Sequence, residues 1–445
     1  MRLVIQNGHV IDIESDLDQI CNVVIEDGII TEITDEPRSG DQIIDATGNY
    51  VVPGFIDIHM HEQDLEEFYT GINIDELRQG VTSVVCGNCG TNHYDPLWYL
   101  DYIEKNGAPV NIGILAGHTY FRNQVGATDK YASVTPVQLK DLVERLQKAV
   151  DGGCLGVSYG IRYVPGINEQ ELIETARVCC KDDKLIAAHV RDDAAYIIKS
   201  MKEFIDAGKQ LNLSVEVSHI GSMGGFGQMR ECLELIRDYR NQGVDVHADC
   251  YPYYAFSTEI GETTYDEGFL ERYQCDYSAI ELSNGKYKGQ RCTKEIFEKL
   301  RKNEPDTITV AYVMKEEDVD LAIKDEFIML ASDGLKDHGQ GHPRASGSFV
   351  RLINQFVKKD KLTLKEALNK MTLMPAKKLK LKNKGRIQIG CDGDLVIFDF
   401  SKIADTATFE NPSQEPKGIE YVVINGQIAL VGKQLVNLHL GTIIK

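Results

Sequence analysis

The sequence lacks any apolar run long enough to cross a bilayer, and it lacks a hydrophobic segment at its start. Its first residues, MRLVIQNGHVIDIESDLD, turn polar and acidic at once, unlike a signal peptide. Basic residues are also few: 48 lysines and arginines stand against 68 aspartates and glutamates, giving a net charge of −20. Nucleic acids and anionic membranes repel such a chain. We therefore expect a soluble, cytoplasmic protein that acts on a small molecule or another protein, with its oligomeric state open.

The cysteines lack the pairing that a disulfide framework or a zinc ribbon would show. There are 11 of them, an odd number, and only Cys86 and Cys89 form a C-x-x-C pair. A chain of 445 residues that is 42% hydrophobic can bury a large core without disulfides. We expect reduced thiols that mostly pack as small buried hydrophobic groups.

The two ends of the chain have a strand-and-turn pattern that the middle does not share. Short strand-like runs near the N-terminus are separated by Asn7-Gly8, Asp27-Gly28 and Ser39-Gly40, and near the C-terminus by Asn425-Gly426. Asn-Gly and Asp-Gly between such runs are typical of β-hairpins. We expect residues 1–52 and 380–445 to form one small β-sandwich domain.

Residues 53–379 alternate apolar strand-like runs with amphipathic helices, which predicts a parallel sheet covered by helices. Nine runs compete for the eight places of a (β/α)₈ barrel. TITVAY, at 307–312, is the doubtful one, because it closes an irregular stretch. That stretch, residues 251–306, is rich in Tyr, Glu and Gly and is interpreted as an insertion that could act as a lid.

Candidate metal ligands stand at the ends of the expected strands. His59 and His61 end GFIDIHMH, and residues two apart in a strand point to the same face. Cys89, His189, His219 and Asp333 follow or end four other runs. Barrel enzymes place their active sites at this end of the strands. Imidazole with thiolate favours zinc. His247 lies three residues before the end of its run and ranks below the others.

With these motifs the sequence resembles the amidohydrolase superfamily, in VVPGFIDIHMH and in a late strand that ends Ser-Asp-Gly. Within it, VVCGNCG, HPRASGSF and the tail KGRIQIGCDGDLVIFD are similar to N-acyl-D-amino-acid deacylases, or D-aminoacylases. The resemblance covers nearly the whole chain. It implies a (β/α)₈ barrel of the metal-dependent amidohydrolase type and hydrolysis of the amide bond of N-acyl-D-amino acids.

The resemblance also implies roles for single residues. Cys89, His189 and His219 would hold one tightly bound zinc ion, and His59, His61 and Asp333 a second site that shares Cys89. Cys89 replaces the lysine that many relatives carry on strand 4, and LGVSYG indeed offers no lysine. Asp333 would act as general base and then general acid, taking a proton from water and passing it to the leaving amine.

The substrate carboxylate needs hydrogen-bond donors, and a guanidinium suits it best. Arg344, in HPRASGSF, is the first candidate, and Arg191 and Arg272 are alternatives. The neutral candidates are Tyr163, Tyr251, Tyr253 and Ser257. His118, His247 and His342 could orient the ligands. Relatives commonly carry a lysine where this chain has Gly221, so its binding of the carboxylate must differ.

Two other functions stay open. A cyclic-amide hydrolase of the dihydroorotase or hydantoinase type shares the histidines and the aspartate but normally uses the strand-4 lysine. A non-catalytic scaffold that binds metal would not require Asp333 as a proton carrier. The preference for D-amino acids follows only from the resemblance. Residue types alone do not define which side chain or which acyl group the substrate carries.

Overall fold

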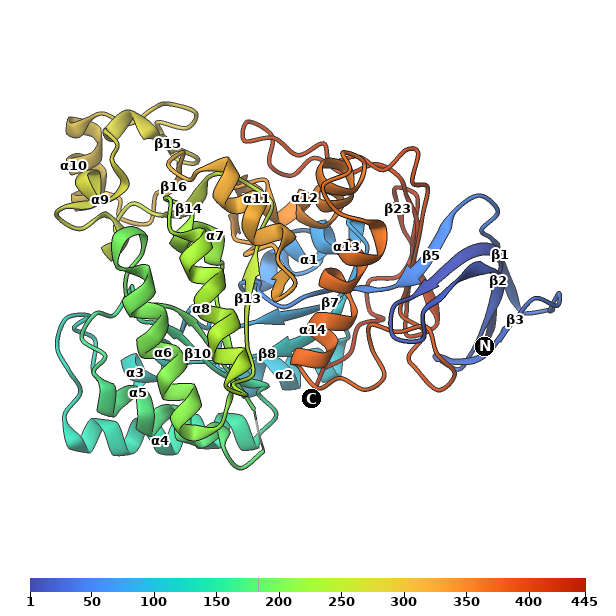
Figure 1. Cartoon of the computed structure of the whole chain (residues 1–445), viewed down its shortest axis with the longest axis horizontal. Helices are drawn as coiled ribbons and strands as arrows, with labels where there is room; N and C mark the ends of the chain where they lie inside the picture. Colours follow the sequence, from blue (N-terminus) through green and yellow to red (C-terminus); the bar gives the residue numbers. More distant parts are fainter. Residues whose placement is uncertain (183) are drawn as a thin grey trace.

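The structure is a computed structural model of the whole chain, and it describes residues 1–182 and 184–445 (Figure 1). The fold is of the α/β class, with parallel strands in the middle of the chain and antiparallel strands from both ends. Among the described residues, no helix has both the length and the apolar character that a membrane crossing requires.

The middle of the chain forms two parallel sheets, ordered β6-β7-β8 and β9-β10-β11-β12-β13-β17. Only Leu115 separates β8 from β9, so the second sheet continues where the first one stops. At the other end, Met60 after β6 forms a parallel bridge with Gly334 after β17. The strands are β6 (Phe55–Asp57), β7 (Val81–Cys86), β8 (Asn111–Ile114), β9 (Ala116–Gly117), β10 (Gly156–Gly160), β11 (Leu185–His189), β12 (Ser214–Val217), β13 (Val246–Cys250) and β17 (Ile328–Leu330).

Helices connect and cover these strands. They are α1 (Ile72–Arg78), α2 (Pro96–Asn106), α3 (His118–Gln124), α4 (Pro136–Asp151), α5 (Glu169–Ala176), α6 (Ile197–Leu211), α7 (Ile220–Gly224), α8 (Met229–Asn241), α11 (Glu316–Lys324), α12 (Arg344–Arg351), α13 (Leu364–Met371) and α14 (Leu373–Lys378). Capping boxes at Thr135 and Thr363 begin α4 and α13 and satisfy otherwise unpaired backbone N–H groups. Short 3₁₀ turns occur at Leu65–Glu67, Arg177–Cys179 and Ala194–Tyr196, and α12 continues into a π-helical turn at Leu352–Val357.

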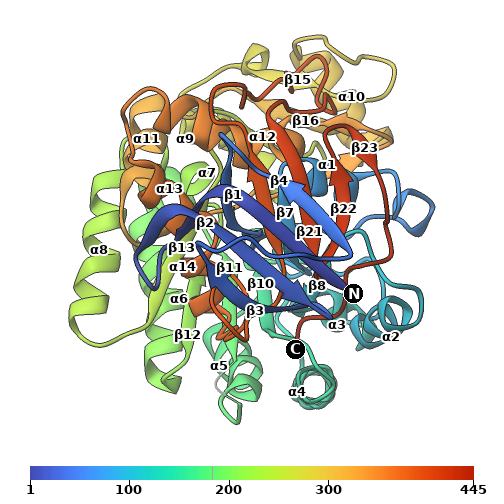
Figure 2. The same cartoon turned by 90° about the vertical axis from the view of Figure 1, so that its right-hand side faces the viewer.

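The two chain ends share one nine-stranded sheet, in which β5 pairs with β1 on one side and antiparallel with β20 on the other. Figure 2 shows the blue N-terminal and red C-terminal strands side by side. The strands are β1 (Arg2–Asp12), β2 (Leu17–Glu26), β3 (Ile29–Thr34), β4 (Gln42–Asp45), β5 (Tyr50–Pro53), β20 (Leu395–Phe398), β21 (Ile419–Ile424), β22 (Gln427–Val431) and β23 (Gln434–Leu435).

Of the turns expected at the N-terminus, Asp27-Gly28 joins β2 to β3, but Asn7-Gly8 is not a turn. It lies inside β1, where the register against β2 shifts between Ile5 and Gly8 and Asn7 has a φ of 59°. This is a β-bulge, which uses the same left-handed backbone as a hairpin turn without reversing the chain. Asn425-Gly426 does join β21 to β22 as expected.

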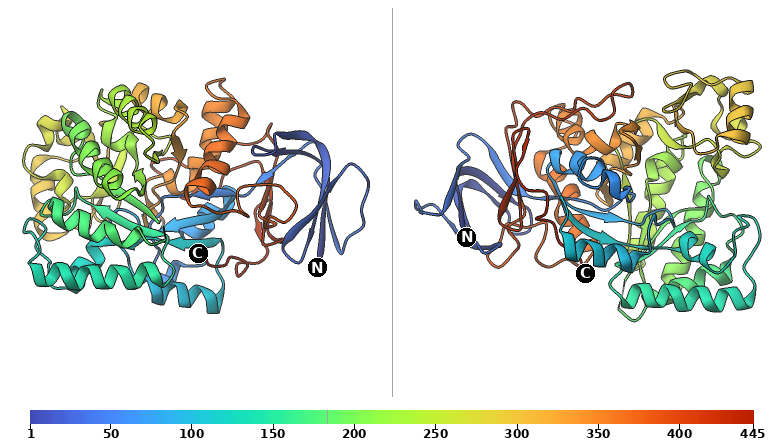
Figure 3. Two further views of the ribbon diagram at one scale, coloured as in Figure 1. Left: turned by 60° about the horizontal axis from the view of Figure 1, so that its bottom comes forward. Right: turned by 180° about the vertical axis from the view of Figure 1, so that it is seen from behind.

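The insertion after β13 is more ordered than its composition suggested. Its strands β14 (Phe256–Glu259), β15 (Ile280–Leu282) and β16 (Ile308–Ala311) form a separate antiparallel sheet, so TITVAY is not one of the parallel strands. Helices α9 (Phe269–Tyr273) and α10 (Lys294–Asn303) complete it, with 3₁₀ turns at Thr263–Tyr265 and Tyr277–Ala279. The insertion, in yellow, lies far from the terminal strands in both views of Figure 3.

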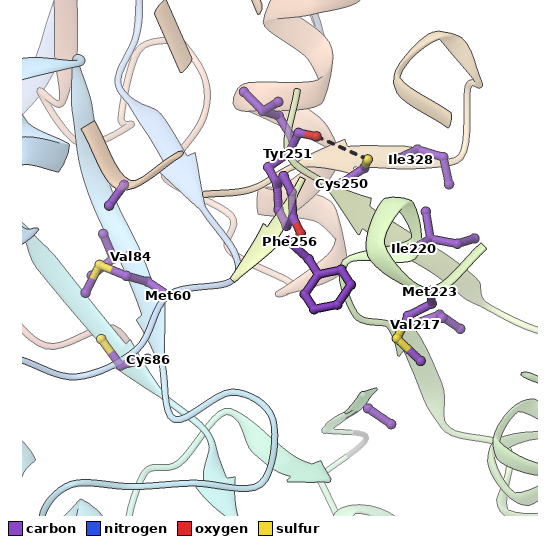
Figure 4. Packing of buried hydrophobic residues seen from close by; sticks show 14 of the residues in the cluster. Met60, Val84, Cys86, Val217, Ile220, Met223, Cys250, Tyr251, Phe256 and Ile328 are labelled. Carbon is purple, nitrogen blue, oxygen red and sulfur yellow. Dashed lines mark hydrogen bonds between the residues drawn. The ribbon is translucent and has the colours of Figure 1, made fainter. Parts of the chain in front are cut away.

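The hydrophobic core extends beneath the ends of the parallel strands, where Figure 4 shows Met60, Val84 and Cys86 on one side and Val217 and Met223 on the other. Cys86 is fully buried, and this burial raises the pKa of its thiol well above the usual value. Its sulfur is therefore an unionised part of the core.

Candidate metal centre

Four buried side chains from distant parts of the chain meet at the carboxyl ends of the parallel strands. The ligand atoms of His59, Cys89, His219 and Asp333 all lie within 4.8 Å of one another. The Cys89 Sγ is 3.3 Å from His219 Nε2 and 3.5 Å from His59 Nε2, and the same His59 nitrogen is 3.4 Å from Asp333 Oδ1. The four residues are at most 5% exposed.

Three of these four residues have a left-handed backbone, which side-chain-bearing residues rarely adopt. The φ angles are 54° at Cys89, 34° at His219 and 49° at Asp333. Each such residue costs roughly 1–3 kcal/mol and persists only where the surrounding structure enforces it. The strain occurs directly after a strand, where the chain bends so that the side chain can face the cluster.

The two other predicted ligands flank this group. His61 Nε2 lies 3.2 Å from Asp333 Oδ1. The His189 ring lies 4.4 Å from the His219 ring, and its buried Nδ1 has no hydrogen-bond partner in the described chain. Burial and the neighbouring His219 lower the pKa of His189 to about 4, so its imidazole is neutral and can donate a lone pair to a metal. All six predicted ligands therefore gather at one place.

The electrostatics of the cluster favour the anionic forms of two ligands. Burial alone would raise the pKa of the Cys89 thiol, but His219 and His59 hold it well below its usual value. Burial acts in the same way on Asp333, and Arg344 with His219 keeps the pKa of that carboxyl well below its usual range. A buried thiolate and carboxylate among imidazoles form a donor set that suits zinc.

Asp249, the next-to-last residue of β13, contacts two of the candidate ligands and was not predicted from the sequence. His59 Nδ1 lies 3.1 Å from its Oδ2, and the backbone N–H of His219 donates to its Oδ1 at 2.9 Å. Such a contact fixes the ring orientation and leaves Nε2 free for a metal. Ser222 does the same for His219, with its Oγ 3.1 Å from Nδ1. The sequence feature that could have pointed to Asp249 is its place one residue before the end of the strand-like run VDVHADC.

Two adjoining cavities open onto this cluster. A small chamber of about 20 Å³ is lined by His189, His219, Asp333 and Tyr251, among others. A larger cavity of about 410 Å³ is lined by His61, Cys89 and Asp333 together with residues of the insertion. The residues that line both are Tyr163, Ser257, Thr258, Asp333 and Arg344. The predicted binding residues Tyr163, Tyr251, Ser257 and Arg344 are therefore at the site.

Arg344 is only 2% exposed and lies against both Asp333 and Tyr251. Its Nη1 is 2.8 Å from Asp333 Oδ2, and its guanidinium stacks 4.7 Å from the centre of the Tyr251 ring. His342 accepts the backbone N–H of Arg344 at 3.0 Å, which fixes the start of α12. The Arg344 Nε and the Tyr251 hydroxyl are both buried and make no hydrogen bond of good geometry within the described chain, although Ser222 and Arg344 lie close to that hydroxyl. Two donors are thus free for a bound ligand.

Three of the predicted substrate-binding side chains do not line either cavity. The Arg191 guanidinium is held by Glu203 at 2.6 Å and by two backbone carbonyls. Arg272 pairs with Asp193 at 3.0 Å. Tyr253 lies behind α12, where its hydroxyl is 3.4 Å from the Pro343 carbonyl oxygen. Unlike Arg344, which also has an internal partner but lines both cavities, Arg191 and Arg272 lie outside both cavity linings, a distinction that the sequence does not provide.

The histidines considered as orienting residues also differ in position. His118 pairs with Glu171 at 3.2 Å, away from the cluster. His247 is the second residue of β13 and contacts Asp245 and Arg240. Asp249, two residues further along the same face of the strand, contacts the His59 ring and so has the ligand-orienting position that was considered for His247. His342 orients Arg344, not a metal ligand.

At position 221, where the resemblance implied a lysine in relatives, a side chain would point into the core. A Cβ built on Gly221 would lie 2.7 Å from the Cys250 sulfur, which is buried. Ser222 and Met223, the next residues in α7, line the small chamber instead. No cation enters the chamber from this helix.

Comparison with known proteins gives consistent matches over almost the full length. The model of the amidohydrolase family matches residues 50–429. A D-aminoacylase from Alcaligenes xylosoxydans xylosoxydans is 30% identical over 90% of this chain and 88% of its own length. An N-acyl-D-glutamate deacylase from the same organism is 29% identical over 95% of this chain and 92% of its own.

A solved structure shows the same arrangement in three dimensions. It is an N-acyl-D-glutamate deacylase from Bordetella bronchiseptica, complexed with zinc and a phosphonate inhibitor that mimics the tetrahedral intermediate of the reaction. It superposes with a TM-score of 0.89 at 26% identity, covering 99% of this chain and 98% of that one. The matches confirm the family that the sequence motifs predicted.

Proposed function

Because this chain belongs to the amidohydrolase family, in the branch that contains D-aminoacylases, we infer that it hydrolyses N-acyl-D-amino acids to a carboxylate and a free D-amino acid. The observation that carries this inference is the joint presence of Cys89, two histidines and Asp333 beside the free donors of Arg344 and Tyr251. The first group suits amide hydrolysis with a metal, and the second suits a substrate carboxylate.

The cofactor is zinc. Cys89, His189 and His219 would hold the tightly bound ion, and His59, His61 and Asp333 would complete a second site that shares Cys89. Zinc bound there supplies Lewis acidity toward the amide carbonyl and lowers the pKa of water. The buried thiolate and carboxylate fit this assignment, since buried charges in proteins are paired or coordinate metals.

Asp333 acts as the general base and then as the general acid. Arg344 keeps its carboxylate ionised, which is the form that accepts a proton from the attacking water. The proton then passes to the amide nitrogen, because an amine must be protonated to leave. Asp333 lines both cavities, so it can reach the water on one side and the leaving group on the other.

Arg344 and Tyr251 bind the substrate carboxylate in the small chamber. Their unpartnered Nε and hydroxyl groups supply the two donors, with Tyr163 and Ser257 beside them. A charge-assisted bond from a guanidinium is stronger than a neutral one. This arrangement replaces the lysine that relatives carry where this chain has Gly221.

We also propose that the parallel strands β6 to β13 and β17 make one closed (β/α)₈ barrel within residues 53–379. The bridge between Met60 and Gly334 supports closure. Residues 1–52 and 380–445 would form the separate β-domain, and the insertion would cover the mouth of the barrel. This arrangement leaves the strand ends as the floor of the active site.

A cyclic-amide hydrolase is the alternative within the same family, and the sequence of β10 speaks against it. That strand reads GVSYG and carries no lysine for a carboxylated metal ligand. Cys89 occupies the cluster instead. A non-catalytic scaffold would have no need of a buried Asp333 held ionised.

The test is an assay for free amino acid with the zinc-loaded protein and paired N-acetyl-D- and N-acetyl-L-amino acids. We expect release from D substrates only, loss of release after chelation, and its return on adding zinc. Hydrolysis of dihydroorotate or a hydantoin, with no release from any N-acetyl amino acid, would favour the cyclic-amide alternative. Bound zinc without turnover of either class would favour the scaffold.

A further inference from the structure

The larger cavity carries more carboxylates than cations. Glu62, Glu259, Glu262 and Asp333 line it, against Lys130 and Arg344. Two ion pairs account for four of these six groups: Arg344 with Asp333 at 2.8 Å and Lys130 with Glu262 at 3.0 Å. Glu62 and Glu259 form no ion pair with any residue that the structure describes, and His61 and Lys130 act on them only from a longer range.

These two remaining carboxylates differ in how they are satisfied. Glu62 accepts hydrogen bonds from the Asn92 side chain at 2.9 Å and from the His93 backbone N–H at 2.8 Å. The Glu259 carboxylate has no hydrogen bond or ion pair to any residue that the structure describes. Burial and, after it, the neighbouring Glu262 and Asp306 raise the pKa of Glu259, and Lys130 offsets this only in part. A further positive charge beside Glu259 would stabilise its ionised form.

Strand β14 places Glu259 a short distance beyond Ser257, a residue that lines both cavities. Ser257 and Glu259 are two residues apart in this strand, so their side chains point to the same face. Ser257 lines both cavities, while Glu259 lines only the larger one. Two residues of strand span about 7 Å, a distance that a long aliphatic side chain can cover.

The small chamber fixes which end of a substrate points inward. Tyr251 is 1% exposed, its hydroxyl is unpartnered, and it lines that chamber together with Arg344. The space in this chamber suits one or two water-sized groups, such as the oxygens of a carboxylate. A substrate anchored there by its carboxylate extends its side chain into the larger cavity, toward Glu259.

We propose that this protein selects N-acyl-D-amino acids with a positively charged side chain, and that the Glu259 carboxylate pairs with that charge. The proposal rests on the proposed function. It separates this chain from the relative named for N-acyl-D-glutamate, because Lys130, the lysine that lines the described cavity, is already paired with Glu262.

The experiment compares N-acetyl-D-arginine with N-acetyl-D-citrulline, which has the same shape without the charge. N-acetyl-D-glutamate supplies the opposite charge. With the zinc-loaded full-length protein, we expect kcat/KM for the arginine substrate to exceed that for the citrulline substrate about tenfold, the scale of a charge-assisted contact. The glutamate substrate should be the poorest of the three.

Three variants test whether Glu259 causes the preference for the arginine substrate over the citrulline substrate. Glu259→Gln should bring the arginine-to-citrulline ratio close to one, and Lys130→Met should raise the ratio because it leaves Glu262 unpaired. Glu298→Gln is the matched control: it lies exposed on α10 of the same insertion, outside the reaction cavity, 3.8 Å from Lys294. This control should keep the wild-type ratio. Zinc content measured on each variant checks that it is folded.

Each outcome decides the matter. Equal rates on arginine and citrulline substrates, a preference for glutamate, or an unchanged ratio in Glu259→Gln would overturn this inference and leave the proposed function standing. If no N-acetyl-D-amino acid of any side chain is hydrolysed, the proposed function fails and the inference fails with it.

Discussion

The active-site cavity has two sides that are built differently. On the side of the strand ends, His59, Cys89, His219 and Asp333 are almost fully buried and contact one another at 3.3–3.5 Å. On the side of the insertion, Ser257 and Glu259 are half-buried, and the Glu259 carboxylate has no partner in the described chain. The groups proposed to carry out the reaction are therefore held by the packed sheet, while those proposed to select the substrate lie on the insertion that leaves it.

The largest effect should come from Asp333→Asn, on the strand-end side. Asparagine keeps the shape but cannot take a proton, so kcat on N-acetyl-D-methionine should fall by about 10³-fold, within the range for a general acid–base group. Zinc content, measured in parallel, should stay at one ion or more per chain, because the proposed tight site of Cys89, His189 and His219 keeps its ligands. A variant that keeps a tenth of the activity would show that another group moves the proton.

Asp249→Asn should act on the same side but through the metal. Its carboxylate contacts both the His59 ring and the His219 backbone, so an amide there should weaken zinc binding by roughly 10–100-fold, the usual cost of losing such a partner. Competition with a chromophoric chelator measures the affinity. The exposed Asp238→Asn on α8 serves as control, and equal affinities in both variants would remove Asp249 from the metal site.

Tyr251→Phe tests whether the small chamber, which lies between the two sides, binds the substrate carboxylate. Losing one hydrogen bond to the substrate carboxylate should lower kcat/KM by about tenfold, mainly through KM. Stability should be unchanged or higher, because the hydroxyl is buried without a partner in the free protein. A marked drop in melting temperature would mean that this hydroxyl serves the fold.

The smallest effect should come from Glu259→Gln on stability. Burial raises the pKa of Glu259 in the folded protein, so its ionisation costs folding free energy once the pH exceeds the unfolded pKa of about 4.3. The glutamine variant avoids this cost and should melt about 1 °C higher at pH 8, corresponding to about 0.5 kcal/mol. The difference should shrink as the pH falls through the unfolded pKa and be nearly lost at about pH 3, where the carboxyl is protonated in both states.

Calorimetry of the metal-free protein at the two pH values measures this difference. A loss of stability in Glu259→Gln as large as that of a core substitution would contradict the division between the two sides. It would mean that the insertion is packed as tightly as the strand ends.

Much of this arrangement could be predicted from the sequence, because it depends on local patterns. The apolar runs that end in His59, His189, His219 and Asp333 are strands or end just after them, and their ends do meet. Cys89 was found in the same way. The prediction of a turn at Asn7-Gly8 was wrong, since a bulge and a hairpin turn both place residues in the left-handed region.

The binding residues were less predictable, since an arginine or tyrosine has the same motif whether it faces the cavity or the fold. Arg344 and Arg191 both follow strand ends, but only Arg344 lines the cavities, while Arg191 pairs with Glu203. Tyr251 and Tyr253 stand two residues apart after β13, and only Tyr251 lines the small chamber. The irregular backbone there does not preserve the alternation of a strand.

The sequence by itself determined the parallel strands, the ligands at their ends and the family. Each of these depends on a repeat of hydrophobic residues over a few positions or on a short sequence motif. Only the tertiary structure decided that Asp249 holds His59 across 190 residues of chain, and that Glu259 forms no ion pair or side-chain hydrogen bond within the part of the chain that the structure describes. Such pairings depend on which strands and loops become neighbours, and spacing along the chain does not encode that.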